Sequence, residues 1–340
     1  MSDPSQLSLF GGPIAPAPAA LSSAAPALHV APAPASEELR PLAAAMPKGL
    51  RFGTSSWTFP GWAGQVYDRE YSSAALVKDG LAAYARHPLL NTVGVDRTYY
   101  APVGSEVFAS MAEQVDDDFR FVVKAHEDCL CHTFPTHPRY GARGGERNPR
   151  FLDASYARDA VIGPAVEGLG DKLGVLLFQA PPQDVFAIGG PGRFAVLLDR
   201  FLEGIRADIN VAFELRNASL LTRDVSDVLR EHGATASISH HPQLPSVEEQ
   251  ADRWGPQRGA LVVRWMLRRG LRYDAAKRRY EPFSKIVDTD DSTRDAIVRL
   301  SVEAVSSGRP VYVIVNNKAE GSSPASVARL AEALKDQSVA

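Results

Sequence analysis

Short β-rich segments alternate with longer amphipathic segments along most of this chain, and this alternation restricts the fold more than any other feature of the sequence. Eight β-rich segments can be counted, at residues 50–54, 92–96, 119–124, 174–179, 210–214, 235–239, 261–265 and 311–316. Helical patterns lie between most of them, most clearly at 73–86, 105–114, 193–203, 219–231, 293–306 and 324–335. Eight strands joined by helices predict an α/β fold, a single (β/α)8 barrel of the TIM type.

The composition changes before the first of these strands. Residues 11–47 consist mainly of Ala, Pro and Ser, with too few large apolar side chains to offset the entropy lost on ordering. We therefore expect a disordered linker there, which together with residues 1–10 makes a disordered N-terminal tail, and a barrel at 48–340. Within the barrel, residues 129–157 are polar and rich in Pro and Gly, which predicts a long loop over the rim.

Charge and cysteine content bear on where such a chain works. A formal net charge of -3 gives no overall basic field, so contact with nucleic acid would need a local patch. Cys129 and Cys131 are the only cysteines and lie too close together to cross-link a large fold, which favours a reducing compartment. The first residues lack the pattern of a signal peptide, and no apolar run reaches membrane-spanning length. We expect a cytoplasmic protein without membrane contact.

Several predicted strands end in a polar residue directly after an apolar run. These residues are Ser55, Asp96, Lys124, Gln179, Glu214, Arg264 and Asn316. In a barrel of this type the C-terminal strand ends meet at one face, so we expect a shared polar pocket on that rim. Each residue taken alone has a structural alternative, since a Glu beside an Arg is commonly a buried ion pair.

The strand ends also carry a resemblance to a known family. The segments concerned are Gly53-Thr54-Ser55-Ser56-Trp57 with Pro60-Gly61-Trp62, Asn91-Thr92-Val93 with Thr98-Tyr99-Tyr100, Phe119 to Lys124, Leu176 to Pro182, Phe213-Glu214-Leu215-Arg216 and Val313 to Asn317. Together they resemble the YecE-like family, domain of unknown function 72, over nearly the whole chain after the linker. The resemblance implies a TIM-type barrel and no particular reaction.

Two segments depart from the pattern of that family. Gly94-Val95-Asp96-Arg97 stands where the family commonly has Glu-Ile-Asn-Ser, and Arg216-Asn217-Ala218 stands where Arg-His-Pro is usual. A role carried by the missing Glu or His would therefore not transfer to this chain. Asp96 is the candidate to replace the carboxylate of the second strand.

Asp96 and Glu214 are the two strand-end carboxylates, and they suggest acid–base chemistry. Lys124 would lower the pKa of one carboxyl while burial raises that of the other, which gives an acid and a base at neutral pH. We predict Asp96, Lys124 and Glu214 as catalytic residues of a hydrolase, lyase or isomerase. The alternative ties Glu214 to Arg216 or Lys124 in a structural ion pair. The residues predicted to bind substrate are Ser55, Trp57, Tyr99, Gln179, Arg216, Arg264, Asn316 and Asn317.

No motif in the sequence requires a cofactor, and a divalent metal is left open by two groups of residues. The first group carries ligand types of a soft metal and consists of His126, Cys129, Cys131 and His132. The second would combine the carboxylates Asp96 and Glu214 with two histidines after the sixth strand, His240 and His241.

Two loops near the end of the barrel have the composition of anion sites. Gly321 and Ser322, between the last strand and the last helix, are predicted to bind phosphate, with an ordinary loop and helix cap as the alternative. A basic stretch that contains Trp265 runs from Arg264 to Arg279. Such a stretch either tracks a nucleic-acid backbone or forms a solvated charged face.

The most specific functional feature lies outside the barrel, at Gln6-Leu7-Ser8-Leu9-Phe10. This peptide is similar to the one through which bacterial replication and repair proteins dock on the DNA sliding clamp. There, the Gln hydrogen-bonds at the mouth of a pocket and the Leu-Phe pair fills an apolar cleft. A peptide in a tail can present such anchors because they have no core of their own to join. The alternative is a chance apolar patch.

Three functions follow from these features. The first is an enzyme of bacterial DNA repair or nucleotide metabolism that acts on a phosphate-containing substrate and associates with DNA indirectly, through the clamp. The second is a small-molecule barrel enzyme, an isomerase or hydrolase of a sugar or sugar phosphate. The third is a non-catalytic adaptor of the clamp. Barrel architecture alone does not decide among them.

Overall fold

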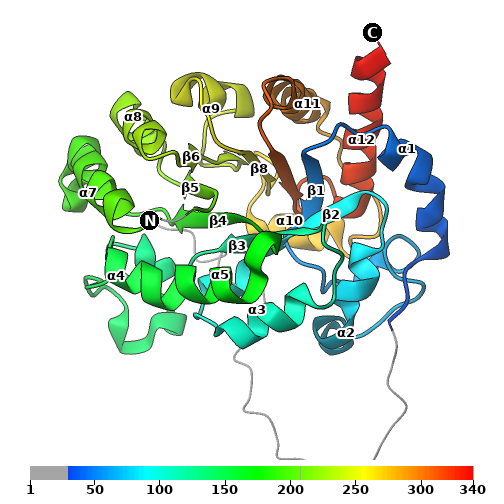
Figure 1. The fold of residues 1–340 in the computed structure, drawn as a ribbon, viewed down its shortest axis with the longest axis horizontal. Coiled ribbons are helices and arrows are strands. Elements are labelled where there is room, and N and C mark those ends of the chain that lie inside the picture. The colour runs from blue at the N-terminus through cyan, green and yellow to red at the C-terminus, as the bar shows by residue number, and fades with distance from the viewer. Residues whose placement is uncertain (1–29, 207, 340) are drawn as a thin grey trace, which may run out of the picture.

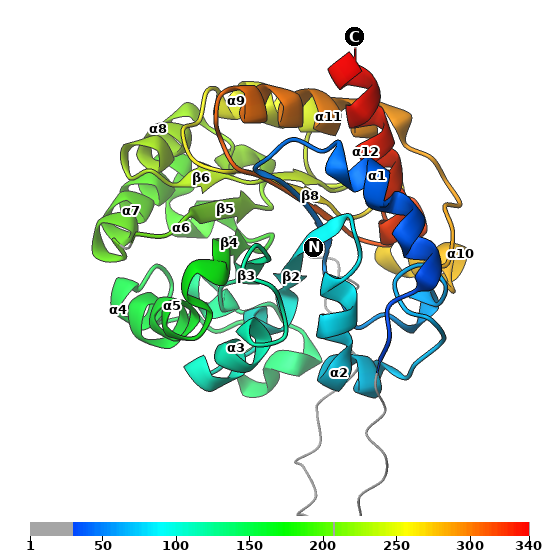
Figure 2. The same cartoon turned by 45° about the vertical axis from the view of Figure 1, so that its right-hand side comes forward.

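The computed structural model describes residues 30–206 and 208–339. In this part of the chain, parallel strands form one sheet in the order β6-β5-β4-β3-β2-β1-β9-β8-β7. The strands are β1 (Leu50–Thr54), β2 (Leu90–Val95), β3 (Arg120–Lys124), β4 (Leu173–Ala180), β5 (Val211–Leu215), β6 (Thr235–Ala236), β7 (Ile238–His240), β8 (Leu261–Trp265) and β9 (Val311–Val315). Helices surround the sheet on its outside (Figures 1 and 2). The predicted barrel of the TIM type is confirmed.

The short strands β6 and β7 together occupy the position of the sixth barrel strand. A single residue, Ser237, separates them; β6 pairs with β5 and β7 pairs with β8. Ser237 joins both neighbours, because its amide donates to the Phe213 carbonyl at 2.8 Å and its hydroxyl to the Val262 carbonyl at 3.2 Å. The nine assigned strands therefore correspond to the eight that the sequence predicts, with the sixth interrupted in its middle.

Most helices connect successive strands, and several of them begin at a residue whose side chain caps the helix. They are α1 (Arg40–Ala44), α2 (Ser73–Ala85), α3 (Ser105–Ala112), α4 (Ala154–Ala157), α5 (Gly163–Leu169), α6 (Val185–Ile188), α7 (Gly190–Gly204), α8 (Arg223–Glu231), α9 (Val247–Trp254), α10 (Tyr273–Tyr280), α11 (Asp291–Ser306) and α12 (Ser323–Val339). Ser72, Thr222 and Ser246 each accept a backbone hydrogen bond at the start of a helix, and Ser246 forms a capping box with Glu249. No helix among the described residues is long and apolar enough to cross a membrane.

Alternation along the strands produces two apolar regions. The larger one lies between sheet and helices, and it contains Phe121, Val123, Phe178 and Phe213. The smaller one consists of the intervening residues Val122, Val175, Leu177, Ala212, Ala260, Val262, Tyr312 and Ile314. Because side chains alternate with a period of two, this second set points into the barrel and fills its lower part. Gly174 leaves the room that Tyr312 needs, since a Cβ there would lie 2.9 Å from the Tyr312 ring.

The predicted disordered linker is wrong for its C-terminal part. Residues 34–39 form a 3-10 turn that leads into α1, and Val30 and Ala33 are buried. The Ala33 amide donates to the Val66 carbonyl at 2.9 Å, and Leu39 and Leu42 pack against the core. The composition did not predict this order, because a few small and apolar side chains suffice to dock a short segment on a surface that the rest of the fold provides. Residues 11–29 lie outside the described residues.

The loop predicted over 129–157 connects β3 to the helices before β4. Asn148 closes it, because its side-chain amide donates to the carbonyls of Asp128 and Cys131 at 2.7 Å each. A bridge between Thr133 and Arg147 links its two halves. The loop is less solvated than its composition suggests, since both of its cysteines are buried.

Candidate functional site

The side chains that point into the barrel change from apolar to polar toward the C-terminal strand ends. Each polar residue stands two positions beyond an apolar residue of the inner set, for example Lys124 beyond Val122 and Arg264 beyond Val262. The residues in this arrangement are Lys124, Gln179, Glu214, Arg264 and Asn316. The period of two therefore gives them the inward orientation of the apolar residues beneath them.

Arg264 is the centre of a buried network of ion pairs. Its Nη1 donates to Glu214 Oε2 at 2.7 Å and to Gln179 Oε1 at 3.2 Å, and its Nη2 lies 3.2 Å from Asp96 Oδ2. The other oxygen of Glu214 accepts from Arg216 Nε. All four charged side chains are buried. The network joins the ends of the second, fifth and seventh barrel strands into one unit, which we call the Arg264 network.

The Arg264 network keeps Glu214 ionised. Burial alone would raise the pKa of the Glu214 carboxyl, but Arg216, Arg264 and Lys124 outweigh it and hold this pKa well below its usual range. Such a carboxyl does not exchange a proton near neutral pH. The contacts therefore favour the structural ion pair for Glu214 over the raised-pKa acid of the acid–base hypothesis.

Lys124 lies at a similar depth but has different neighbours. Its residue is 6% exposed, and its ammonium nitrogen lies 4.1 Å from the centre of the Tyr99 ring. The Thr98 hydroxyl, which bonds to the carbonyls of Val95 and Lys124, holds the segment before Tyr99 against β3. Lys124 Nζ forms no hydrogen bond or ion pair with any described residue.

The surroundings of Lys124 suit proton transfer. Burial lowers the pKa of Lys124 to about 8, although the charges of Asp96 and Glu214 raise it. An amine of this pKa exchanges its proton close to neutral pH, and its lone pair is then available as a base or nucleophile. Of the three predicted catalytic residues, Lys124 thus has the surroundings that the chemistry needs.

The predicted substrate-binding residues divide into two sets. Tyr99, Gln179, Arg216 and Arg264 surround Lys124 and the two carboxylates, and Ser55 accepts a hydrogen bond from Asn316 Nδ2 at 3.3 Å. Trp57 and Asn317 face elsewhere. The Trp57 indole donates to the Leu76 carbonyl at 3.1 Å, and Asn317 Oδ1 accepts from Trp62 and Ser323. These two residues hold loops in place and do not join the polar layer.

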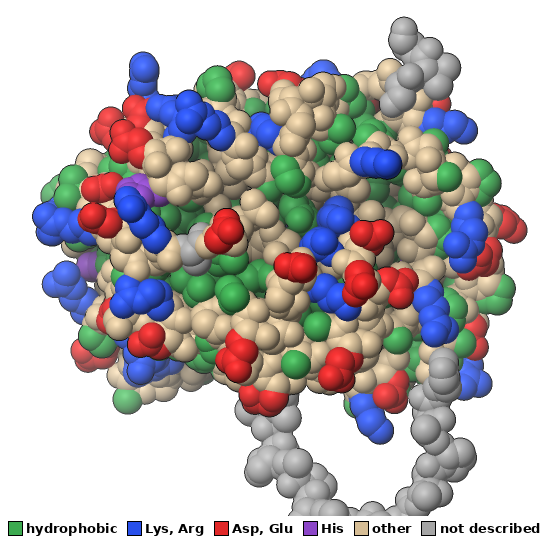
Figure 3. Space-filling view, in the orientation of Figure 1, with side chains coloured by type: hydrophobic (Ala, Val, Ile, Leu, Met, Phe, Trp, Pro, Cys, Tyr) green, Lys and Arg blue, Asp and Glu red, His purple; other side chains and the backbone are tan. Residues whose placement is uncertain are grey.

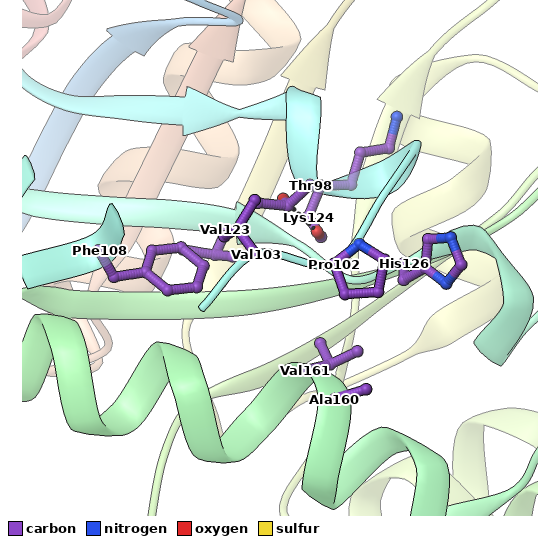
Figure 4. A pocket seen from close by; sticks show the side chains of 9 residues that line it. All are labelled: Thr98, Pro102, Val103, Phe108, Val123, Lys124, His126, Ala160 and Val161. Carbon is purple, nitrogen blue, oxygen red and sulfur yellow. Dashed lines mark hydrogen bonds between the residues drawn. The ribbon is translucent and has the colours of Figure 1, made fainter. Parts of the chain in front are cut away.

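A small pocket beside β3 lies outside the barrel. Its lining consists of Thr98, Pro102, Val103, Phe108, Val123, Lys124, His126, Ala160 and Val161 (Figure 4). The Lys124 side chain leads away from Ala160 and Val161 in this view. The pocket is mainly apolar, and it is separate from the polar layer to which the Lys124 ammonium belongs.

In the turn predicted to bind phosphate, two backbone amides and a hydroxyl already donate to other residues of the chain. The Gly321 amide donates to the Asn317 carbonyl at 2.8 Å, and the Ser323 amide to Asn317 Oδ1 at 2.9 Å. Ser322 is fully buried, and its hydroxyl bonds to Gln65 at 2.9 Å. A phosphate would have to displace these contacts, so the geometry favours the alternative of an ordinary loop and helix cap.

Neither metal hypothesis finds its ligands assembled. Across residues 30–206 and 208–339, no three His, Cys, Asp or Glu side chains form a group that could hold a metal ion. His126 Nδ1 lies 2.6 Å from the Tyr156 hydroxyl, and burial raises the pKa of both cysteine thiols to about 12. His240 faces Asp290 at 3.5 Å, and burial, aided by Arg216, lowers the pKa of His241 to about 2.

The basic stretch after the seventh barrel strand is divided between interior and surface. Arg264 points into the barrel, whereas Arg268 donates to the carbonyls of Asp288 and Thr289. The exposed Arg269 precedes α10 and donates to the Leu244 carbonyl, whereas Lys277, Arg278 and Arg279 lie exposed on α10, where Arg279 pairs with Asp288. On the face drawn in Figure 3, acidic and basic side chains are interspersed, so this face offers no broad basic surface.

Lys318 is a residue of chemical interest that the pattern of the strand ends does not single out. This lysine follows the last strand by three positions and is 7% exposed. The available signal was its place directly after the strand-end pair Asn316-Asn317, in the eighth strand-to-helix loop.

Comparison with known proteins agrees with this fold. The sequence model of a family described as "Protein of unknown function DUF72" matches residues 51–340. The structure of a DUF72 family protein from Thermotoga maritima covers 86% of this chain and 99% of its own, with 19% identity and a TM-score of 0.52. One from Enterococcus faecalis covers 84% of this chain and 94% of its own, with 19% identity and a TM-score of 0.51. Among curated proteins no match was found.

Proposed function

The chain belongs to the DUF72 family, and on this premise we propose that its barrel is an enzyme whose acid–base group is Lys124. The observation that carries the proposal is a lysine, 6% exposed, whose ammonium forms no hydrogen bond or ion pair with any described residue. A charge held in this way costs stability, and proteins keep such groups mainly where function needs them. The reaction classes that suit the site are hydrolysis, elimination and isomerisation, all of which need a proton carrier.

The charge balance of the layer supports an anionic, phosphate-containing substrate. Three cationic side chains, Lys124, Arg216 and Arg264, lie beside two carboxylates, Asp96 and Glu214. One positive charge is left over when Lys124 is protonated. An anion at the mouth would balance this charge and raise the pKa of Lys124, so that binding would favour the protonated, acid form.

The N-terminal peptide supports a place for this enzyme in bacterial DNA repair or nucleotide metabolism. Gln6, Leu7, Ser8, Leu9 and Phe10 lie outside the described residues, and the proposal that they dock on the sliding clamp rests on their sequence. Docking would raise the concentration of the barrel near DNA, so its own surface would need little affinity for DNA. The interspersed charges of the face in Figure 3 are compatible with such indirect association.

Substrate turnover tests the role of Lys124. The full chain and the Lys124→Met variant are assayed against nucleotides, sugar phosphates and oligonucleotides with abasic or damaged positions. The control is Lys78→Met, which changes an exposed lysine on α2. We expect the control to convert one member of the panel as the natural chain does, and Lys124→Met to be slower by about a hundredfold or more. Equal rates for all three proteins would contradict the proposal. A sugar phosphate as the converted member would favour the small-molecule enzyme.

Binding to a purified bacterial sliding clamp tests the tether separately. Replacing Leu9 and Phe10 by Ala should abolish binding, because two large anchors carry most of the affinity of such a peptide. The matched control replaces Leu21 and Leu28, two apolar residues of the same tail outside the motif. Loss of binding in both variants, or in neither, would reduce the motif to coincidence. Clamp binding combined with no turnover of any substrate would instead favour the non-catalytic adaptor.

A further inference from the structure

A second buried lysine lies in the loop between β9 and α12. Hydrogen bonds fix the backbone of Lys318 on both sides of its Cα: its amide donates to Asn316 Oδ1 at 3.0 Å, and its carbonyl accepts from the Arg268 amide at 3.1 Å. The residue is 7% exposed. Its position is therefore set by the eighth strand-to-helix loop and the seventh one together, the two loops that often hold a phosphate in barrels of this type.

Two aromatic rings lie beside the Lys318 ammonium. Its nitrogen lies 4.3 Å from the centre of the Tyr273 ring and 5.6 Å from that of Phe283. Phe283 has a φ of +62°, a conformation that costs energy for a residue with a side chain, and its ring meets Phe59 edge-on at 5.2 Å. The fold thus holds Phe283 in a strained conformation that places its ring beside the Lys318 ammonium.

No carboxylate among the described residues forms an ion pair with this ammonium. Lys318 Nζ forms no hydrogen bond or ion pair with any described residue. The ammonium of Lys277, on α10, lies near enough to repel that of Lys318. The Glu281 carboxylate attracts Lys318, but its Oε1 also lies 3.8 Å from Lys277 Nζ. Burial first, and then Lys277, lower the pKa of Lys318 to about 8. Two neighbouring cations share one exposed carboxylate, so one positive charge stays unbalanced among these three residues.

We infer that Lys318 and Lys277, against the ring of Tyr273, bind the phosphate group of a substrate whose reacting part lies at Lys124. Tyr100 lies near residues of both sites, since Asp96 and Tyr273 both act on its pKa. A phosphate here would stand at the seventh and eighth loops without using the occupied turn at Gly321. This inference rests on the proposed function, because it divides one substrate between an anchoring lysine and a reacting lysine.

Protection from acetylation tests the site in the natural full chain, without any variant that could fail to fold. The acetylation rate of each lysine by dilute acetic anhydride is measured by mass spectrometry at pH 7, with increasing inorganic phosphate and with the ionic strength held constant by sodium chloride. A bound phosphate should slow acetylation of Lys318 by about tenfold, because a rise of one unit in its pKa removes nine-tenths of the free amine. Exposed Lys78 should be unaffected.

Further arms of the experiment identify the source of the phosphate group. Ribose 5-phosphate and thymidine 5′-monophosphate are titrated in the same way, and the ester that protects at the lower concentration indicates the substrate class. Lys277→Met should fold normally, because its side chain is half exposed, and should weaken protection of Lys318. An unprotected Lys318, or equal protection by chloride alone, would overturn the site. Protection by inorganic phosphate but by neither ester would overturn its link to a substrate.

These results are distinguishable from failure of the proposed function. The acetylation rate of Lys318 does not require turnover, so the site can fail while Lys124→Met still abolishes activity. Conversely, Lys318 can be protected by phosphate while Lys124→Met retains full activity, which would leave an anion site beside a barrel with another reactive group.

Discussion

The Arg264 network and the two buried lysines lie in the same half of the barrel, but their charges are balanced differently. Glu214 and Arg264 are 0% and 1% exposed, and hydrogen bonds and ion pairs occupy them on both sides. Lys124 and Lys318 are 6% and 7% exposed, and each rests on aromatic rings with no acceptor among the described residues. The difference teaches that burial alone does not identify a functional charge. A paired buried charge mainly supports structure, whereas an unpaired one marks where a ligand or proton is expected.

Glu214→Gln should give the largest change in stability. The variant leaves the buried guanidinium groups of Arg216 and Arg264 without their shared carboxylate, and breaking such a buried pair costs about 3–5 kcal/mol. Urea unfolding at pH 7 measures this loss. A loss of stability below about 1 kcal/mol, combined with complete loss of turnover, would contradict this expectation. Glu214 would then be a catalytic group although its charge is paired.

Lys124→Met should change stability in the opposite direction. The folded-state pKa of Lys124 is about 8, below the usual value near 10.5, so the folded protein carries an uncompensated cost wherever the lysine is protonated in both states. Replacement by an uncharged side chain of similar length should therefore stabilise the protein by about 1–3 kcal/mol below pH 8.

The pH dependence sharpens this prediction. As the pH rises from about 8 to about 10.5, the folded state loses the proton before the unfolded state does, so the natural protein gains stability. The advantage of Lys124→Met should shrink over that range and vanish above it. Urea midpoints at pH 7 and pH 10 give the two values. A destabilised variant at pH 7 would show that the ammonium has a partner and that the contrast with Glu214 is wrong.

Asp96→Asn should have the smallest effect on stability, about 1 kcal/mol. Arg264 keeps Glu214 as its main partner in this variant, and the contacts of Asp96 are long, at 3.2 Å and 3.3 Å. The pKa of Lys124 should nevertheless fall below 8, because Asp96 is the first of the charges that raise it. A loss of stability equal to that of Glu214→Gln would place Asp96 at the centre of the network.

Much of the barrel could be predicted from the sequence because strand periodicity is a local property. The predicted segments 50–54 and 261–265 coincide with β1 and β8. The break at Ser237 could not be predicted, since the pattern over 235–239 continues through it and only the neighbouring strands reveal the change of partner. The order of residues 30–45 was missed for a similar reason. The composition of a segment indicates whether it can form a core by itself, but not whether the rest of the fold provides a surface on which it can pack.

The candidate site was predictable as a set of residues, but not as a set of pairs. Alternation along the strands placed Lys124, Glu214 and Arg264 on the inward side. Which carboxylate each arginine contacts depends on residues far apart in the chain, such as Arg264 and Asp96, which are separated by 168 positions. The acid–base hypothesis therefore gave Glu214 a role that its two arginines disfavour, and the loop residue Lys318 was overlooked because it stands beyond the strand ends.

The titration of Lys124 in the natural full chain tests the central claim most directly. Lysine labelled with carbon-13 at Cε reports the protonation of each ammonium by NMR, and the signal of Lys124 is assigned from its absence in Lys124→Met. The claim that this buried amine lacks a partner and is ready for proton transfer predicts a pKa of about 8. A pKa at the ordinary lysine value near 10.5 would contradict it, because the ammonium would then be solvated or paired as any surface lysine is.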